Sequence, residues 1–214
     1  MINVLVVDDH DIVRSGISRL ISDEKGLKVH GECSSGEDAV AWCRKNDVDV
    51  ILMDMTMPGI GGLEATRKIV RINPDVKIIV LTAYAEQPIP KRVMQAGAFG
   101  FLTKDSAPTD VLKAIRQVAA GQRFLSPEVA QAMAMGALGD TSDNPFDELS
   151  ERELQITMMI INGEKATDMA EKLNLSPKTV NSYRYRIFDK IKVTGDVELT
   201  LAAIRHGILD KSRI

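Results

Sequence analysis

The strongest constraint in this chain is a set of short, largely apolar runs that end in acidic side chains. One run, at residues 4–7, is followed directly by Asp8 and Asp9, and another, at residues 48–53, ends in Asp54. Runs of this kind are typical of strands that are buried on both faces of a parallel sheet. Open sheets of this type bind ligands at the carboxyl ends of their strands. The sequence therefore predicts a parallel sheet with carboxylates gathered at one edge.

The first 121 residues alternate between strand-like and helix-like segments. Strands are expected near residues 3–7, 27–33, 48–53, 77–82 and 99–103. Helices are expected near residues 12–22, 36–45, 62–71, 90–96 and 108–120. Alternation with short connections predicts right-handed crossovers and a doubly wound α/β fold. We therefore expect residues 1–121 to form one domain around a five-stranded parallel sheet.

The remainder of the chain has a helical pattern. Ser126 and Pro127 favour the start of a short helix inside a linker predicted at residues 122–145. Further on, Ser150 and Glu153 form a capping-box pattern, which marks the start of a helix. Helices are expected near residues 151–162, 167–173, 177–191 and 196–206. A small all-α domain with a helix-turn-helix is therefore predicted at residues 146–214.

The distribution of charge says more than its total. The formal net charge is −3, which does not by itself indicate a protein that binds nucleic acid. Residues 176–192, however, carry five basic side chains and only one acidic side chain. A basic helix face of this kind can bind nucleic acid or can simply be solvated, so charge alone does not decide between the two.

The cellular context is suggested by what the sequence lacks. No apolar stretch approaches the ~20 residues that a membrane span requires, and the N-terminus lacks the layout of a signal peptide. We therefore expect a cytoplasmic protein with no membrane partner. Cys33 and Cys43 follow neither a Cys-x-x-Cys nor a metal-site spacing, so they are expected to be reduced structural thiols.

Four expected strand ends carry groups that suit phosphoryl transfer. Asp8, Asp9 and Asp54 offer carboxylate oxygens, which Mg²⁺ prefers as ligands. Asp54 is also a candidate nucleophile, because a carboxylate can form an acyl phosphate. Lys104 can pair with phosphoryl oxygens, and the Thr82 hydroxyl can donate to one of them. One acid at a strand end is more often a cap or a turn residue, but the whole set predicts a Mg²⁺-dependent phosphoryl site.

Residues 1–121 resemble a bacterial receiver domain. The motifs that carry the resemblance are Val7-Asp8-Asp9, Met53-Asp54, Met57-Pro58-Gly59, Leu81-Thr82-Ala83 and Lys104. The resemblance implies that Asp54 accepts the phosphoryl group, and that the metal ligands are Asp8, Asp9, Asp54 and the backbone carbonyl of Thr56. It also implies that Thr82 is the switch hydroxyl, Phe101 the switch aromatic residue and Lys104 the phosphate contact. An ordinary core aromatic residue would look the same as Phe101, and Asp105 stands where many receivers have a proline.

The expected helix at residues 177–191 has two different faces. Apolar side chains recur at helical spacing and should face the domain core; they are Val180, Tyr183, Ile187 and Ile191. The opposite face carries Lys178, Asn181, Ser182 and Tyr185, flanked by Arg184 and Arg186. Asparagine can read adenine through two hydrogen bonds, whereas lysine and arginine neutralise phosphates. The face therefore suits DNA recognition, with a solvated surface as the alternative.

Residues 147–208 resemble a LuxR-type helix-turn-helix. The matching segments are Leu149-Ser150-Glu151-Arg152-Glu153-Leu154, Met169-Ala170-Glu171-Lys172-Leu173 and Leu175-Ser176-Pro177-Lys178-Thr179-Val180. Joined to a receiver, this domain gives the layout of NarL/FixJ response regulators. The segments at residues 58–68 and 175–186 are most similar to the GacA/UvrY/SirA group of these regulators. The DNA contacts that we expect on this basis are Lys178, Thr179, Asn181, Ser182, Arg184, Tyr185, Arg186 and Lys190.

The resemblance also implies how the protein works and with which partners. A sensor histidine kinase would phosphorylate Asp54, and phosphorylation would favour a homodimer that binds promoter DNA, with RNA polymerase as a further partner. The genes controlled would include small regulatory RNAs. Val197, Leu201 and Ile204 lie on one side of the last expected helix, where they serve either a dimer interface or the core.

An alternative from another class is a Mg²⁺-dependent phosphohydrolase that forms an aspartyl phosphate on the same type of sheet. Enzymes of the haloacid-dehalogenase kind place a second Asp two residues after the nucleophile as a general acid. Here that position is Thr56, which cannot protonate a leaving group efficiently. We therefore expect a regulator rather than an enzyme.

Overall fold

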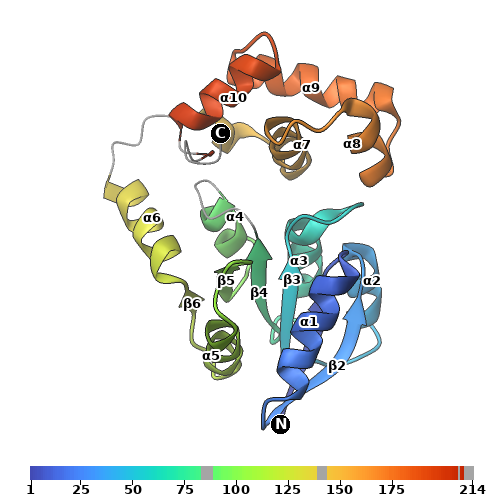
Figure 1. Ribbon diagram of the computed structural model, residues 1–214, viewed down its shortest axis with the longest axis vertical. Coiled ribbons are helices and arrows are strands. Elements are labelled where there is room, and N and C mark those ends of the chain that lie inside the picture. The colour runs from blue at the N-terminus through green and yellow to red at the C-terminus, as the bar shows by residue number, and fades with distance from the viewer. Residues whose placement is uncertain (83–88, 139–143, 207, 210–214) are drawn as a thin grey trace. The chain divides into compact units, whose positions relative to one another are not determined.

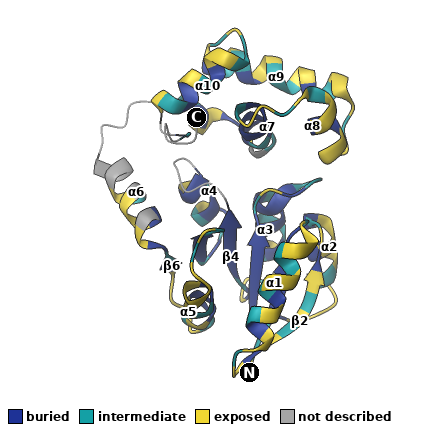
Figure 2. Cartoon of the chain, in the orientation of Figure 1, coloured by how far each residue is buried: buried dark blue, intermediate teal, exposed yellow. Residues whose placement is uncertain are grey.

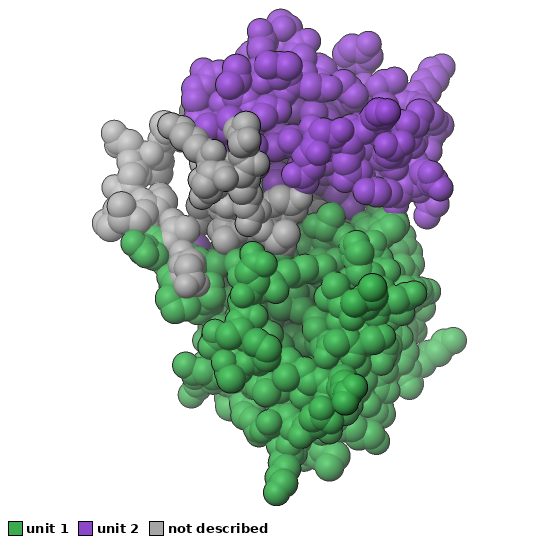
Figure 3. Space-filling view, in the orientation of Figure 1, with its two compact units in different colours: residues 1–85, 89–131 green, residues 86–88, 132–214 purple. Residues whose placement is uncertain are grey.

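The computed structural model of the chain describes residues 1–82, 89–138, 144–206 and 208–209 (Figure 1). Two compact units are present, and Figure 3 colours them green and purple. Among the described residues, those up to 131 belong to the first unit and those from 132 onward belong to the second. The two units are described separately below.

The first unit is built on a parallel sheet with strand order β2-β1-β3-β4-β5-β6. The strands are β1 (Ile2–Val7), β2 (Leu27–Cys33), β3 (Val50–Asp54), β4 (Lys77–Thr82), β5 (Gly100–Thr103) and β6 (Phe124–Leu125). Each neighbouring pair is parallel, which confirms the predicted sheet type. The sixth strand was not predicted, because two residues are too few to show a strand period. It lies at the start of the predicted linker, so the compact unit extends beyond residue 121.

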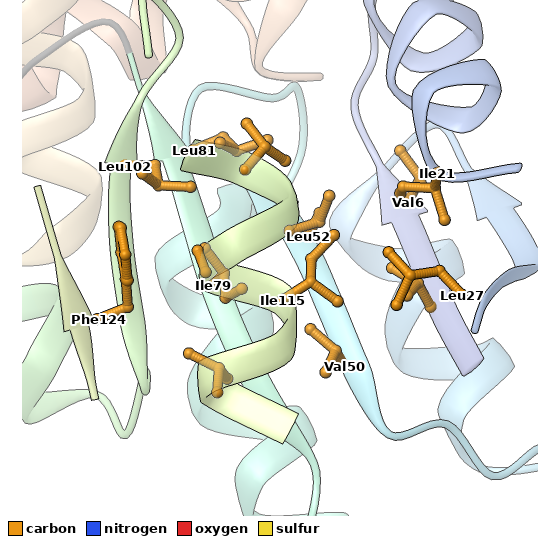
Figure 4. Close-up of a cluster of buried hydrophobic side chains, with 14 residues drawn as sticks. Val6, Ile21, Leu27, Val50, Leu52, Ile79, Leu81, Leu102, Ile115 and Phe124 are labelled. Carbon is orange, nitrogen blue, oxygen red and sulfur yellow. The ribbon is translucent and has the colours of Figure 1, made fainter. Parts of the chain in front are cut away.

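Helices cover both faces of this sheet. They are α1 (Asp11–Ser22), α2 (Gly36–Cys43), α3 (Gly61–Ile72), α4 (Ile89–Gln95) and α5 (Pro108–Ala119). Ile115 of α5 lies beside Leu52 of β3 and Ile79 of β4, and all three are fully buried (Figure 4). Burying each of these side chains contributes about 1.5–3 kcal/mol. Ile51 and Ile78 precede Leu52 and Ile79 in their strands, so they face the other side of the sheet, and both are fully buried. Figure 2 shows β4 in dark blue, as expected for a strand covered on both faces.

Both cysteines lie in the first unit as free thiols. Cys33 ends β2 and Cys43 ends α2, and both are buried. Burial raises the pKa of Cys33 to about 11 and that of Cys43 to about 12. The thiols are therefore protonated at neutral pH, in agreement with the structural role expected from the sequence.

The second part of the chain is helical. Its elements are α6 (Pro127–Leu138), the 3₁₀ helix η1 (Pro145–Glu148), α7 (Glu151–Ile161), α8 (Ala166–Lys172), α9 (Pro177–Ile191) and α10 (Asp196–Arg205). The capping box of Ser150 and Glu153 is formed, and Ser176 caps α9 through the backbone N–H of Thr179. Asn174 adopts a left-handed conformation (φ 50°) in the tight turn between α8 and α9. Along the described parts of the chain, no helix is long and apolar enough to cross a membrane.

Candidate functional site

Three carboxylates meet at the C-terminal edge of the sheet. Asp8 directly follows β1, Asp9 follows Asp8, and Asp54 is the last residue of β3. One carboxylate oxygen from each acid and a ring nitrogen of His10 all lie within 4.8 Å of one another. Asp8 and Asp54 are each only 1% exposed. The parallel register of β1 and β3 brings these acids together, as the sequence predicted.

Lys104 stands between two of these acids. Its Nζ atom lies 2.9 Å from Asp8 Oδ2 and 2.9 Å from Asp54 Oδ2. The backbone N–H of Lys104 donates to the carbonyl of Thr82 (2.8 Å), which anchors the turn after β5 to the end of β4. Burial alone would lower the pKa of Lys104, but Asp54 and Asp8 raise it above its ordinary value. The lysine is therefore a fixed cation beside the candidate nucleophile.

The surroundings of Asp54 disfavour its negatively charged form. Burial raises its pKa from 3.8 to about 6, Lys104 opposes this increase, and the neighbouring charge of Asp8 adds to it. The backbone N–H of Thr56 donates to Asp54 Oδ1 (3.2 Å) and stabilises the charged form. A carboxylate that is only partly compensated in this way gains from a divalent cation placed beside it.

The pocket fits Mg²⁺ by the chemistry of its donors. Asp9 Oδ1 and Asp54 Oδ2 are shielded from solvent, and their charged or polar neighbours are His10 Nδ1 and Lys104 Nζ, each at 2.9 Å. Carboxylate oxygens that are shielded from water in a cluster of like charge are suited to coordinate a hard cation. Thr56 is exposed and lies against Asp54 through its backbone N–H.

The loop that follows Asp54 is held closely to the site. The backbone N–H of Gly62 donates to the carbonyl of Met55 (3.0 Å), and that of Ile60 donates to Glu37 Oε1 (2.9 Å). A Cβ atom on Gly62 would overlap the carbonyl oxygen of Asp54. Glycine at position 62 therefore lets the start of α3 approach the end of β3, which fixes the backbone around the candidate nucleophile.

Two further predicted residues lie on neighbouring strands. Thr82 is the last residue of β4 and is fully buried, and Phe101 is fully buried in β5. Thr82 lies one strand from Asp54, since Leu81 pairs with Asp54 in the register of β3 and β4. Phe101 pairs with Leu125 of β6, so its backbone touches the strand that leads into α6. Its full burial suits a core residue and a switch residue equally well.

Helix α9 has the two faces that its sequence predicted. Val180 and Ile187 are fully buried and Ile191 is 6% exposed, whereas Tyr183 is half-buried. Lys178, Asn181 and Ser182 are exposed on the opposite side, and Tyr185 is 73% exposed. An exposed tyrosine on a polar face offers both a ring and a hydroxyl group to a partner molecule.

Two of the predicted contact residues on α9 are engaged within the domain. Both carboxylate oxygens of Asp196 accept from Arg184 Nη2, at 2.8 and 2.6 Å. Lys190 Nζ lies 2.7 Å from Glu153 Oε2 and 3.2 Å from the carbonyl oxygen of Glu148. A phosphate contact by either side chain would compete with these bonds.

The remaining basic residues of α9 are more accessible. Arg186 is exposed, and its guanidinium group lies over the ring of Tyr183 at 4.4 Å. Lys178 is exposed at the start of the helix, next to Thr179, whose hydroxyl lies 2.8 Å from that of Ser176. Arg186 and Lys178 therefore present positive charge on this face, although Arg186 Nε also donates to the carbonyl of Ser182 (3.4 Å).

His10 is a member of the acidic pocket that our sequence reasoning missed. Its Nδ1 atom lies 2.9 Å from Asp9 Oδ1 and 3.3 Å from Asp8 Oδ1. The available signal was its position directly after the Asp8-Asp9 pair, at the turn into α1.

Both parts of the chain match known protein families. Residues 4–116 match the family model "Response regulator receiver domain", and residues 147–203 match "Bacterial regulatory proteins, luxR family". Response regulator UvrY of Escherichia coli is 61% identical over 209 residues, which cover 97% of this chain and 96% of that protein. Response regulator GacA of Pseudomonas aeruginosa is 54% identical over 211 residues, which cover 98% and 99% of the two chains.

Solved structures of response regulators are similar to this chain. RcsB from Salmonella enterica serovar Typhimurium, bound to promoter rprA in the presence of the phosphomimetic BeF3⁻, has a TM-score of 0.67 and 28% identity. That match covers 94% of this chain and 98% of RcsB. A two-component response regulator of the LuxR family from Aurantimonas has a TM-score of 0.63 and 35% identity, over 65% of this chain and 99% of that chain.

Proposed function

The chain belongs to the response regulators that join a receiver domain to a LuxR-type DNA-binding domain, and we propose that phosphorylation of Asp54 controls its binding to promoters. It is a transcription regulator of the UvrY and GacA type and not an enzyme, which sets aside the phosphohydrolase alternative. The observation that carries the proposal is the pair of 2.9 Å contacts from Lys104 Nζ to Asp8 and Asp54.

In this proposal a sensor histidine kinase is the phosphoryl donor. An oxygen of the Asp54 carboxylate attacks phosphorus, the bond from phosphorus to the donor breaks, and an acyl phosphate remains on Asp54. Asp8, Asp9, Asp54 and the backbone carbonyl of Thr56 would hold Mg²⁺, which neutralises negative charge on the phosphoryl oxygens. The shielded oxygens of Asp9 and Asp54 support this ligand set.

Lys104 and Thr82 would contact the phosphoryl group and so respond to phosphorylation. Lys104 is already paired with Asp54, so the added phosphoryl oxygens give its ammonium group a second and stronger partner. The buried hydroxyl of Thr82 would donate to another oxygen, and Phe101 on the next strand would respond to that movement. The pairing of Phe101 with Leu125 supports a route from this switch towards the linker helix α6.

Helix α9 would enter the major groove of promoter DNA. Its exposed side chains Asn181, Ser182 and Tyr185 can bond base edges, while Lys178, Thr179 and Arg186 can contact phosphates. Arg184 and Lys190 are assigned a supporting role, because they bond Asp196 and Glu153 inside the domain. Small regulatory RNAs are the genes that the resemblance favours as targets.

The proposal includes a homodimer formed by the phosphorylated protein. Val197 and Leu201, one turn apart on α10, are 75% and 51% exposed, whereas Ile204 is half-buried. Covering the two exposed side chains in a dimer would remove apolar surface from water, which favours association. RNA polymerase would then be recruited to the bound promoter.

Labelling with acetyl phosphate tests the acceptor and the metal together. Wild-type protein should become phosphorylated in Mg²⁺, whereas the nearly isosteric Asp54→Asn variant should not, because an amide is a poor nucleophile. Asp9→Ala, or EDTA added to the wild type, should also abolish labelling. Labelling of Asp54→Asn at the wild-type level would refute the assignment of the acceptor.

A further inference from the structure

His10 stands beside the acidic pocket, although neither its packing nor the capping of α1 requires its side chain to be there. Its side chain is 66% exposed, and it makes no hydrogen bond that caps α1. Its backbone does have structural partners, because its N–H donates to Asp8 Oδ1 (2.8 Å) and its carbonyl accepts from the N–H of Arg14 (3.0 Å). The imidazole is therefore available to the pocket for another purpose.

The geometry of the imidazole suits a metal ligand. In an octahedral site with ligands at about 2.0–2.1 Å from the ion, adjacent donor atoms lie about 3 Å apart and opposite donors about 4 Å apart. His10 Nδ1 lies 2.9 Å from Asp9 Oδ1 and 3.3 Å from Asp8 Oδ1, which match adjacent positions. Donor atoms from all four residues lie within 4.8 Å of one another, so one ion can reach all of them with small shifts.

The pocket also contains carboxylate oxygens that are shielded from solvent. Asp54 is 1% exposed, and its Oδ2 atom is shielded, with Lys104 Nζ 2.9 Å away. Asp9 Oδ1, which lies 2.9 Å from His10 Nδ1, is likewise shielded from solvent. The positive charge of Lys104 repels a metal cation, but the three carboxylates of the pocket carry more negative charge than Lys104 can neutralise.

We propose that His10 is a nitrogen ligand that makes this pocket select late first-row divalent cations, such as Ni²⁺ and Co²⁺, relative to Mg²⁺. Mg²⁺ favours oxygen ligands, whereas imidazole favours later ions in the series that rises from Mn²⁺ to Cu²⁺. This inference rests on the proposed function, because the same carboxylates serve both kinds of ion. Binding of a late cation would occupy the oxygens that Mg²⁺ needs, so it would inhibit phosphorylation of Asp54.

Calorimetric titration of the full chain with Ni²⁺, Co²⁺ and Mg²⁺ tests the inference without measuring phosphorylation. The variants are His10→Ala and His10→Gln, and the matched control is His30→Ala, which removes an exposed histidine of β2 that contacts the Trp42 ring. The ratio of Ni²⁺ to Mg²⁺ affinity should fall at least about tenfold in both His10 variants, since even indirect partners of metal ligands contribute that much. It should remain at the wild-type value in His30→Ala, and the visible absorption of bound Co²⁺ should change only in the His10 variants.

The outcomes separate this inference from the proposed function. If Mg²⁺ binds and requires Asp9, but the Ni²⁺ to Mg²⁺ ratio is unchanged in both His10 variants, the nitrogen ligand is refuted and the phosphoryl site stands. If Mg²⁺ does not bind to the wild type, the proposed phosphoryl site fails. If the Co²⁺ spectrum is the same with and without the imidazole, the inference is also refuted.

Discussion

Lys190 Nζ lies 2.7 Å from Oε2 of Glu153, a carboxylate that is only 3% exposed. The same oxygen accepts the backbone N–H of Ser150 (2.7 Å), so Lys190 joins α9 to the capping box of α7. Burial alone would raise the pKa of Glu153, but Lys190 and Ser150 together lower it below its ordinary value. A basic residue of the candidate recognition helix is therefore part of the framework of its domain.

Replacing Lys190 by alanine should reduce stability. The change leaves the buried Glu153 carboxylate without its cation, and the ion pair is partly screened because Lys190 is 36% exposed. We expect the free energy of unfolding to fall by about 1–3 kcal/mol, less than for a fully buried pair. Urea denaturation measures the loss, and Lys192→Ala is the control, because Lys192 is 78% exposed. Equal stability of the two variants would show that the pair contributes little.

The raised pKa of Asp54 predicts a pH dependence of stability. The folded protein keeps a proton on Asp54 up to about pH 6, whereas the unfolded chain loses it near 3.8. Since the folded state binds more protons in this window, stability should fall as the pH rises through it and then level off. In EDTA at pH 7.5, the free energy of unfolding of Asp54→Asn should therefore exceed that of the wild type by about 2–3 kcal/mol, because one pKa unit corresponds to about 1.4 kcal/mol.

The difference in the free energy of unfolding between Asp54→Asn and the wild type should shrink towards pH 4. Denaturant unfolding at pH 4, 5.5 and 7.5 measures it, with the exposed Asp105→Asn as the control. A constant difference across this range would mean that burial does not destabilise the charged form of Asp54.

Two glycine substitutions should have opposite effects. A methyl group at Gly62 would overlap the backbone of Asp54, so Gly62→Ala should destabilise the protein by about 1–3 kcal/mol and impair labelling of Asp54. Gly16 lies on the exposed side of α1 with no atom near its added Cβ, so Gly16→Ala should stabilise the helix by about 0.5–1 kcal/mol. Thermal unfolding of both variants is the measurement. Normal labelling and stability of Gly62→Ala would show that the loop can move away.

Much of the first unit could be predicted from its sequence because each central strand is a continuous apolar run. The runs that end in Asp8 and Asp54 therefore also located the acids at one edge of the sheet. The two-residue strand β6 could not be predicted in this way. It depends on pairing with Gly100 and Phe101, which are distant in the sequence.

The candidate DNA-binding face was predicted only in part, for a related reason. Helical spacing correctly separated the buried Val180 from the exposed Asn181 and Tyr185. It could not reveal that Arg184 bonds Asp196, because that partner lies on another helix. Spacing within one helix defines its faces, but it does not identify the residues that neighbouring helices bring to them.

Thr82→Ala and Lys104→Ala should separate phosphorylation from its consequences. Each change would remove a proposed partner of the phosphoryl oxygens and keep the proposed nucleophile, so labelling by acetyl phosphate should persist at a reduced rate. The increase in dimerisation and promoter affinity on phosphorylation should shrink in both variants. Sedimentation and promoter titrations at matched phosphorylation levels measure this. Full activation of both variants would place the switch elsewhere.

The surface of α9 predicts different effects on affinity and on specificity. Arg186 lies exposed over the Tyr183 ring, where it can reach a phosphate. Arg186→Ala should therefore weaken binding to all DNA similarly and lower the salt slope by roughly one unit. Asn181 and Tyr185 lie one turn apart on the exposed face. Replacing either by alanine should weaken the free energy of binding to the operator by about 1–3 kcal/mol and the binding to scrambled DNA far less.

Titrations of operator and scrambled duplexes across a salt series distinguish these roles. Ser182, whose hydroxyl donates to the carbonyl of Lys178 (3.0 Å), provides an intermediate case, because a base contact would compete with that bond. Ser182→Ala should therefore lose less operator affinity than Asn181→Ala. If Asn181→Ala and Tyr185→Ala weaken both duplexes equally, these residues do not read sequence. Specificity must then come from DNA shape or from other elements of the domain, because phosphate contacts alone carry no sequence information.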